Sequence, residues 1–374
     1  MRIAFFTETF LPATDGVVTR LRHTIEELAR VGDDMLVIAP RYPDGGPDSY
    51  VGAPIYRVPG VPFPPYPRIK LSFAHPGVGR VLGRFGPDLI HAVNPFILGP
   101  GGIYYARRLG VPLVASYHTN VAAYARYYKL ELGYNAGRWW TRQLHNRADI
   151  NLCTSRAAMD YLLGDGVKRI RLWPQGVDAR RFHPDKASEE CRERLSGGHL
   201  EGKLLLYVGR LAPEKGIERL KAILREVPGA RLAIVGDGPA RGDLEREFEG
   251  LPAVFTGVLQ GEVLASAYAS ADAFLFPSTT DTLGLAMLEA LASGLPVLAA
   301  RSGPSQEIVT EGENGLLYEA DSTPSLVAAV RRLFSDDELR AALARRARAT
   351  AEGRDWASST RALRGYYEEA SRRA

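Results

Sequence analysis

Two carboxylates stand eight residues apart in the segment Pro277-Ser-Thr-Thr-Asp281-Thr-Leu-Gly284-Leu-Ala-Met-Leu-Glu289, directly after the apolar run 273–276. The pattern predicts a strand, a loop and a helix, with Asp281 before the helix and Glu289 about two turns inside it. A helix start presents unpaired N–H groups that favour phosphate, and Gly284 lets a ligand approach the backbone. The pair can therefore meet two parts of one extended ligand, such as a nucleotide sugar, although a capping aspartate and a solvated glutamate also fit.

Two cations occupy a similar position earlier in the chain. Arg210 and Lys215 follow the apolar run 204–208, on a short loop before a predicted helix. An arginine fork and a lysine point charge can neutralise a leaving diphosphate at such a position. Two solvated loop cations would have the same spacing, so the motif gains weight only beside the carboxylate pair.

Three single residues complete the set of candidates. Gly16 stands where the first predicted helix can face a diphosphate, His118 follows a predicted strand, and Gly236 lies in a turn that can border a nucleobase pocket. His118 can donate or accept a hydrogen bond to a sugar hydroxyl. Plain turn chemistry for the two glycines and a structural histidine are the alternative interpretations. No G-x-G-x-x-G segment follows the first strand, which disfavours a classical dinucleotide-binding site.

Short apolar runs alternate with amphipathic stretches along the chain, and this predicts an α/β fold of parallel sheets covered by helices on both faces. The first helix is expected at 17–31, ending at Gly32. The expected strands are 3–6, 35–39, 88–92, 112–117 and 150–154 in the first half, and 204–208, 231–235, 253–255, 273–276 and 297–300 in the second. Two such series predict two doubly wound, Rossmann-like domains.

A polar stretch at 176–202 interrupts the strand signals, and we expect the hinge there. The domains are then 1–180 and 203–355, with a C-terminal helix, 356–374, that packs back. Ligands of open parallel sheets bind beyond the carboxyl ends of the strands. The two sheets are therefore expected to face a central cleft that holds the site.

Composition fits a soluble globular protein, with 45% hydrophobic and 24% charged residues among 374. No run of 18 apolar residues is present, and the first residues, 1–8, favour a strand over a secretory signal. Only two cysteines occur, Cys153 and Cys191, which favours a reducing, cytoplasmic setting.

Charge is uneven between the two halves. Residues 1–183 hold 23 Lys and Arg against 14 Asp and Glu, whereas the remainder holds 24 against 29. A basic first half suggests an anionic partner surface, membrane or nucleic acid, or a merely solvated basic face. Without zinc-finger spacing or an aromatic RNA-binding signature, nucleic acid is not expected as a partner.

No two aspartates occur as D-x-D. Enzymes that hold sugar diphosphates through a metal usually need such a pair, so a metal-free design is expected, with no metal ligands and no cofactor. Cations and a helix N-terminus would then do the work of the metal.

Together these motifs resemble glycosyltransferase family 4, the retaining enzymes of GT-B architecture. The likeness covers nearly the whole chain. The matching segments are the Asp15-Gly16 loop, Ser116-Tyr-His118-Thr, Trp173-Pro-Gln-Gly176-Val-Asp178, Val208-Gly-Arg210-Leu-Ala-Pro-Glu-Lys215, Gly236-Asp-Gly-Pro239 and the Asp281 to Glu289 segment. Two branches are most similar: the sulfoquinovosyl-diacylglycerol synthases, through segments such as Tyr268-Ala-Ser-Ala-Asp272, and bacterial GDP-mannose-dependent α-mannosyltransferases, through His145-Asn-Arg-Ala-Asp149.

The resemblance implies a role for each matching residue of the first half and of the cationic loop. Gly16 would allow close approach of the diphosphate, and His118 would touch the transferred sugar near its 6-position. Arg210 and Lys215 would hold the diphosphate of a UDP- or GDP-linked sugar substrate. Gly236 would lie against the nucleotide.

The same resemblance assigns the carboxylate segment. Backbone amides around Leu283, Gly284 and Leu285 would assist the two cations, and Glu289 would bind ribose hydroxyls. The family has glutamate at both ends of its E-x7-E motif, whereas this chain has Asp281 first. The shorter side chain leaves open whether Asp281 touches the donor sugar directly.

Both branches glycosylate membrane lipids, so the implied reaction transfers a hexosyl group to a lipid such as diacylglycerol or a glycolipid. Aromatic and cationic residues interleave in 61–70, 124–129 and 138–142, as expected of a surface that sits on anionic lipid. Trp139 and Trp140 can instead close the domain core. The expected location is the cytoplasm, peripherally on the inner face of the cell membrane.

Other activities fit the same architecture. A GDP-mannose-dependent α-mannosyltransferase with another lipid or glycan acceptor is one, and a sugar-nucleotide epimerase is another. A phosphorylase would need a pyridoxal-bearing lysine, for which no signature is visible, and a non-catalytic binding subunit is the last alternative. No feature of the sequence predicts an oligomeric state.

Overall fold

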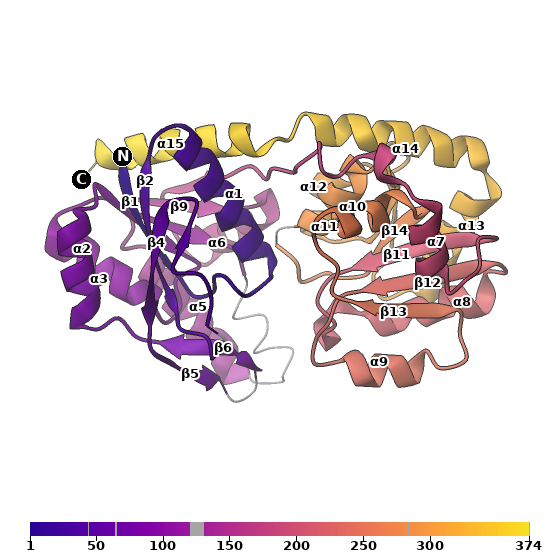
Figure 1. Cartoon of the computed structure of the whole chain (residues 1–374), viewed down its shortest axis with the longest axis horizontal. Helices are drawn as coiled ribbons and strands as arrows, with labels where there is room; N and C mark the ends of the chain where they lie inside the picture. Colours follow the sequence, from indigo (N-terminus) through magenta and orange to yellow (C-terminus); the bar gives the residue numbers. More distant parts are fainter. Residues whose placement is uncertain (44, 64–65, 120–130, 283, 374) are drawn as a thin grey trace. The chain divides into compact units, whose positions relative to one another are not determined.

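The computed structural model describes residues 1–43, 45–63, 66–119, 131–282 and 284–373. The chain divides into two compact units: 1–174 together with 356–374, and 175–355. Each unit has a parallel sheet of its own between helices (Figure 1).

The sheet of the first unit has eight strands in the order β10-β9-β8-β7-β1-β2-β4-β3. All neighbours pair parallel except β3 and β4, which are antiparallel. The strands are β1 (Arg2–Thr7), β2 (Asp34–Pro40), β3 (Ser49–Tyr50), β4 (Ala53–Val58), β7 (Leu89–Val93), β8 (Leu113–Tyr117), β9 (Ile150–Cys153) and β10 (Ile170–Leu172). The five predicted strands are confirmed, whereas β3, β4 and β10 were not predicted.

Helices cover both faces of this sheet, and capping residues mark several of their ends. Asp15, His75 and Ser155 cap helix starts through side-chain hydrogen bonds, and the left-handed Gly86 and Gly110 follow helix ends. The predicted first helix is confirmed as α1 (Gly16–Arg30), which Asp15 caps through the amide of Val18. Helices α2 and α3 lie together on one side of the sheet in Figure 1, while α1 and α15 lie on the other. The remaining elements of this unit are α2 (Pro76–Phe85), α3 (Gly99–Leu109), α5 (Glu131–His145), α6 (Arg156–Gly164), α15 (Trp356–Ser371) and the hairpin β5 (Gly60–Phe63) with β6 (Tyr66–Ser72).

The sheet of the second unit has six strands, all parallel, in the order β13-β12-β11-β14-β15-β16. The strands are β11 (Lys203–Val208), β12 (Ala230–Val235), β13 (Ala253–Gly257), β14 (Ala273–Phe276), β15 (Val297–Ala300) and β16 (Gly315–Tyr318). The chain moves outward from β11 in one direction to β12 and β13, and from β14 in the other direction to β15 and β16. The pair β11 and β14 is therefore the topological switch point, where open α/β sheets bind ligands.

Two apolar cores, one on each face, hold the second sheet between its helices. Helices α10, α11 and α14 contribute to one core, and α8, α9 and α13 to the other. The bounds are η1 (Pro184–Lys186), α7 (Glu189–Ser196), η2 (Pro213–Lys215), η3 (Ile217–Leu220), α8 (Lys221–Glu226), α9 (Arg241–Glu247), α10 (Gly261–Ala269), α11 (Leu285–Ala292), α12 (Gly303–Ile308), α13 (Thr323–Ser335) and α14 (Asp337–Glu352).

The C-terminal helix α15 is fastened to the first unit by polar and aromatic contacts. Arg364 pairs with Asp33 at 2.8 Å, and the hydroxyl of Tyr366 donates to the carbonyl of Leu172 at 2.8 Å. Tyr367 is fully buried. The helix therefore contributes side chains to the interior of that unit.

Both cysteines are free, Cys153 buried and Cys191 partly exposed. Within the described residues, none of the helices combines the length and the apolar composition needed to cross a bilayer.

Candidate functional site

The loops after β11 and β14 bring together four charged side chains at the switch point. Lys215 Nζ donates to Asp281 Oδ1 at 2.6 Å, although the two residues are 66 positions apart. Arg210 pairs with Glu214, whose side chain is 1% exposed. Adjacent parallel strands end at the same edge of a sheet, so the topology itself places Arg210 and Lys215 beside Asp281.

Each cation of this cluster therefore has a carboxylate partner. Burial is the largest single cause and would raise the pKa of the Asp281 carboxyl. The charge and hydrogen bond of Lys215, with a hydrogen bond from Ser278 and the charge of Arg210, together hold that pKa below its usual value. The Lys215 and Asp281 side chains are 12% and 26% exposed, and that of Arg210 is 40% exposed. An ammonium has three N–H donors and a guanidinium five, so both cations keep donors for an anionic ligand while the carboxylates fix their positions.

The junction before α11 differs from the sequence prediction in two ways. The helix starts at Leu285 with Gly284 as its N-cap, and no side chain caps it, so Asp281 is not a capping residue. Glu289 lies just over one turn inside the helix, and the prediction of two turns was wrong. Gly284 has φ +59°, and a Cβ there would lie 2.6 Å from the end of the Ile308 side chain, so this backbone conformation favours glycine. Leu283 lies outside the described residues.

Glu289 is partly buried and is not the solvated glutamate of the simpler interpretation. The hydroxyl of the buried Tyr268 donates to Glu289 Oε2 at 2.9 Å. Burial raises the pKa of the Glu289 carboxyl to about 7, although the Tyr268 hydrogen bond acts in the opposite direction. The side chain therefore changes charge near neutral pH, as functional carboxylates often do.

Gly236 follows β12 and is explained by the packing of two loops. It has φ +139°, and a Cβ there would come within 1.9 Å of the carbonyl oxygen of Gly209. The amide of Leu211 also donates to the carbonyl of Asp237 at 3.0 Å. Glycine at this position therefore keeps the loop that carries Arg210 against the loop after β12.

In the first unit, Gly16 is the first residue of α1. The Asp15 carboxylate accepts from the amide of Val18 at 2.9 Å and from the hydroxyl of Thr9 at 3.0 Å. These bonds join the loop after β1 to the helix start.

His118 follows β8 and is buried, with its amide donating to Asn94 Oδ1 at 3.1 Å. Its Nε2 lies 2.8 Å from the hydroxyl of Ser116. Burial lowers the pKa of His118 well below its usual value, and the positive charge of Arg20 lowers it further. The ring is therefore neutral at physiological pH.

Arg20 beside this histidine was missed by the sequence analysis. Its guanidinium stacks on the Trp173 ring at 3.7 Å, and Nη2 donates to the carbonyls of Trp173 and Pro174, both at 2.9 Å. Burial lowers the pKa of Arg20 to about 9. The signal was its position three residues after Val17 and four before Thr24, on the buried face of the helix.

Glu214 and Tyr268, which hold Arg210 and Glu289, were quoted within motifs and were not predicted as site residues. Glu214 lies four residues from Arg210, so this contact is local in the sequence, whereas Tyr268 is 21 residues from Glu289 and meets it only in the fold. Among the described residues, no group of three or more His, Cys, Asp or Glu side chains is arranged to share a metal ion.

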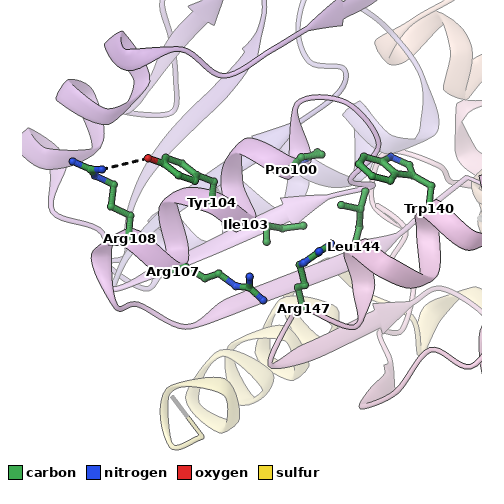
Figure 2. A pocket seen from close by; sticks show the side chains of 8 residues that line it. All are labelled: Pro100, Ile103, Tyr104, Arg107, Arg108, Trp140, Leu144 and Arg147. Atoms are coloured by element: carbon green, nitrogen blue, oxygen red, sulfur yellow. Dashed lines mark hydrogen bonds between the residues drawn. The ribbon is translucent and has the colours of Figure 1, made fainter.

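A separate open pocket of about 550 Å³ lies between α3 and α5 in the first unit (Figure 2). It has an apolar floor and a basic rim. Its lining residues are Pro100, Ile103, Tyr104, Arg107, Arg108, Trp140, Leu144 and Arg147. None of the predicted catalytic or nucleotide-binding residues lines it, and Trp140 alone belongs to a segment predicted to meet lipid.

Comparison with known proteins matches each half of the chain to a glycosyltransferase family model. The family described as Glycosyltransferase Family 4 matches residues 14–181, and that described as Glycosyl transferases group 1 matches 193–350. A sulfoquinovosyl transferase of Arabidopsis thaliana is 39% identical over 373 residues, which cover 97% of this chain and 72% of that protein. A GDP-mannose-dependent alpha-mannosyltransferase of Mycolicibacterium smegmatis is 39% identical over 374 residues, which cover 98% of this chain and 97% of that protein.

Further similarities extend to a lipid glycosyltransferase and to solved structures. An alpha-monoglucosyldiacylglycerol synthase of Streptococcus pneumoniae is 31% identical over 335 residues, covering 85% of this chain and 75% of that protein. A sucrose-phosphate synthase of Thermosynechococcus elongatus has a TM-score of 0.84 at 22% identity, over 98% of each chain. HepE of Anabaena in complex with UDP has a TM-score of 0.77 at 20% identity, over 99% of this chain and 100% of that one.

The expected fold class is thereby confirmed, since these structural neighbours are GT-B proteins with two Rossmann-like domains. The chain belongs to glycosyltransferase family 4 and is a hexosyltransferase with the GT-B fold.

Proposed function

We propose that the protein transfers a hexosyl group from a nucleotide-diphosphate sugar to a membrane lipid, such as diacylglycerol or a glycolipid, with retention of anomeric configuration and without a metal ion. The paired cations Arg210 and Lys215 at the switch point carry this proposal. The relatives support the lipid acceptor, because they include monoglucosyldiacylglycerol synthases and a phosphatidylinositol monomannoside mannosyltransferase.

The two cations hold the diphosphate and stabilise it as it leaves. The bond between the anomeric carbon and the diphosphate oxygen breaks, and the acceptor hydroxyl oxygen bonds to the same face of that carbon. The departing diphosphate oxygen takes the hydroxyl proton, so the products are the glycosylated lipid and the nucleoside diphosphate. Leaving-group stabilisation of this kind is worth about 3–4 kcal/mol for each well-placed group.

Asp281 acts in this scheme by orienting Lys215. Its carboxylate is already held by the ammonium at 2.6 Å, and it is one methylene shorter than the glutamate of the family motif. It therefore secures the cation and reaches the sugar less readily than a glutamate would.

The nucleotide is bound by the elements around α11 and the loop after β12. Glu289 accepts hydrogen bonds from the ribose hydroxyls, with Tyr268 fixing its orientation. Backbone amides at Gly284 and Leu285, at the start of α11, assist the diphosphate, as would Leu283. Gly236 borders the nucleotide.

The first unit supplies Gly16, which permits close diphosphate approach, and His118, which touches the transferred sugar. Its basic, aromatic surface binds anionic lipid at the inner face of the cell membrane. Trp139 is 54% exposed, whereas Trp140 is partly buried and its indole N–H donates to the carbonyl of Phe96 at 2.8 Å, so Trp139 is the more exposed of the two to a membrane. Of the three predicted lipid-facing segments, 124–129 lies outside the described residues.

One screen tests the proposal. The protein is incubated with UDP-glucose, UDP-galactose, UDP-sulfoquinovose or GDP-mannose, each with diacylglycerol vesicles, and lipid products are identified by mass. A glycosylated lipid from one donor, formed equally in EDTA, is expected. Loss of conversion in EDTA would overturn the metal-free part, and NMR of the donor alone would detect an epimerase.

A second candidate is a GDP-mannose-dependent α-mannosyltransferase with another lipid or glycan acceptor. Its support is the 39% identity to the GDP-mannose-dependent alpha-mannosyltransferase of Mycolicibacterium smegmatis over 97% of that protein's length. Product from GDP-mannose with another lipid or glycan acceptor, and no product from any donor with diacylglycerol, would favour it.

A further inference from the structure

A chain of four buried hydrogen-bonding side chains runs from α15 to His118 and is here called the histidine relay. The Tyr367 hydroxyl lies 2.7 Å from His91 Nδ1, and His91 Nε2 lies 2.8 Å from the Ser116 hydroxyl. That same hydroxyl lies 2.8 Å from His118 Nε2. The four side chains come from α15, β7, β8 and the loop after β8, and each is 2% exposed or less.

Both rings of the relay are neutral. Burial lowers the pKa of His91 to about 3, and burial together with Arg20 lowers that of His118 well below its usual value. Each ring therefore carries one N–H proton. With one proton on each hydroxyl as well, four protons must be placed along three contacts.

Only one placement gives every relay hydroxyl an acceptor. If His118 donated from Nε2 and Ser116 donated to His91, then His91 would donate from Nδ1 to Tyr367. The tyrosine proton would then be buried with no acceptor among the described residues. If both rings donated from Nε2 to the Ser116 hydroxyl, the serine proton would have no acceptor among the described residues.

In the remaining placement Tyr367 donates to His91 Nδ1, His91 Nε2 donates to Ser116, and Ser116 donates to His118 Nε2. We propose that this relay fixes His118 as the Nδ1–H tautomer, an obligate hydrogen-bond donor at Nδ1, and that Tyr367 of the C-terminal helix is a positioning residue for it. In the sugar contact proposed above for His118, Nδ1 would therefore donate a hydrogen bond to an oxygen of the donor and could not accept one. The consequence for catalysis rests on the proposed sugar contact of His118, but the tautomer itself does not.

Long-range ¹H–¹⁵N NMR of the ¹⁵N-histidine-labelled protein at pH 7 tests the tautomer directly, with His118→Gln assigning the signals. We expect Nδ1 of His118 to be protonated in the wild type. In Tyr367→Phe the direction of the chain is no longer fixed, so a mixture with the Nε2–H form is expected. Tyr366→Phe is the matched control, because that hydroxyl sits on the same helix and donates instead to Leu172.

Enzyme kinetics give the second measurement. Tyr367→Phe is expected to lower kcat/KM for the donor about five- to tenfold, beyond any loss in Tyr366→Phe of equal thermal stability. An Nε2–H tautomer in the wild type, or an unchanged tautomer in Tyr367→Phe, would overturn the proposal. If the tautomers behave as expected and no nucleotide sugar is turned over, the relay stands and the proposed function fails.

Discussion

The switch-point loops of the second unit and the histidine relay of the first unit differ in how their polar side chains are paired. Charged partners pair in the loops, whereas neutral hydrogen bonds join the side chains of the relay. The loops hold four charges in two ion pairs, and the Arg210 side chain stays 40% exposed. The relay holds no charge of its own and is sealed from solvent. Paired charges can exchange partners with an incoming anion, whereas a buried neutral chain fixes the direction of one hydrogen bond. The first arrangement suits a diphosphate and the second a hydroxyl.

The largest effect expected is in the charged loops. Lys215→Ala or Arg210→Ala should lower kcat at least about 100-fold, because each removes one cation from the leaving diphosphate. Lys221→Ala is the control, since Lys221 pairs with Glu247 in a partly exposed ion pair at 2.5 Å, elsewhere in the same unit. Steady-state turnover is measured with the donor found in the screen. Near-normal turnover in both loop variants would end the assignment of these cations.

Removing the charge of Asp281 should have a smaller effect. Asp281→Asn leaves Lys215 in place without its ionic partner, so kcat is expected to fall about tenfold through misorientation of the ammonium. Asp281→Glu restores the family residue and the charge, and should keep most of the activity. If the asparagine variant loses as much as Lys215→Ala, Asp281 has a direct role that positioning does not explain.

Glu289 allows the charged region to be titrated. With a pKa of about 7, its carboxylate forms as pH rises through neutrality, and donor KM should fall about three- to tenfold between pH 5.5 and 8. Glu289→Gln should flatten that profile, and Tyr268→Phe should move its midpoint upward because the tyrosine hydrogen bond lowers the pKa. If the pH dependence of donor KM is unchanged in Glu289→Gln, the titration of Glu289 does not govern donor binding, and its assignment to the ribose hydroxyls is wrong.

The same raised pKa predicts the sign of a stability change. The pKa of Glu289 in the folded protein lies above the ordinary 4.5, so its contribution is fully present below about pH 4.5 and is lost as pH rises through about 7. The free energy of unfolding of the wild type, relative to Glu289→Gln, should therefore decline across that window. Urea unfolding at pH 4.5, 6 and 7.5 measures it, and the opposite slope would contradict the burial argument.

The sequence predicted the strands of both regions better than the contacts between them. Ala273–Phe276 and Val297–Ala300 were confirmed to the residue, because continuous apolar runs are what buried parallel strands require. The strands Ile170–Leu172 and Gly315–Tyr318 were missed because neither is a continuous apolar run: the first has Arg171 at its centre, and the second begins at a glycine, which strands disfavour. The predicted position of Glu289, two turns inside the helix, was wrong because Gly284 has a left-handed conformation and the helix therefore begins only at Leu285.

The contacts of the candidate site could not be predicted, for a physical reason. Lys215 meets Asp281 only because β11 lies beside β14, and strand order is a property of the whole sheet. The relay joins positions 91, 116, 118 and 367, so no local spacing contains it. Candidate residues could thus be named from motifs, whereas their partners required the fold.

Arg20 is a buried charge that acts on both histidines of the relay, and its removal gives the smallest expected effect. Arg20→Met keeps an apolar chain against Trp173 and loses the hydrogen bonds to the carbonyls of Trp173 and Pro174. It also removes two buried guanidinium nitrogens, Nε and Nη1, that have no hydrogen-bond partner in the described part of the chain. These opposing changes should leave the free energy of unfolding only about 1 kcal/mol lower.

The informative measurement on this variant is the titration of the relay. Because Arg20 lowers the pKa of both His91 and His118, the two values should rise in Arg20→Met, yet stay below 6.5 since burial is the larger cause. NMR titration of the histidine ring protons measures this, with Arg22→Met on the same helix as control. Unchanged values would mean that burial alone keeps the rings neutral, whereas values near 6.5 would mean that the guanidinium does so. pKa values that rise but stay below 6.5 would show that burial and the Arg20 guanidinium together keep the two rings neutral. The single direction of the hydrogen bonds along the relay would then depend on both causes.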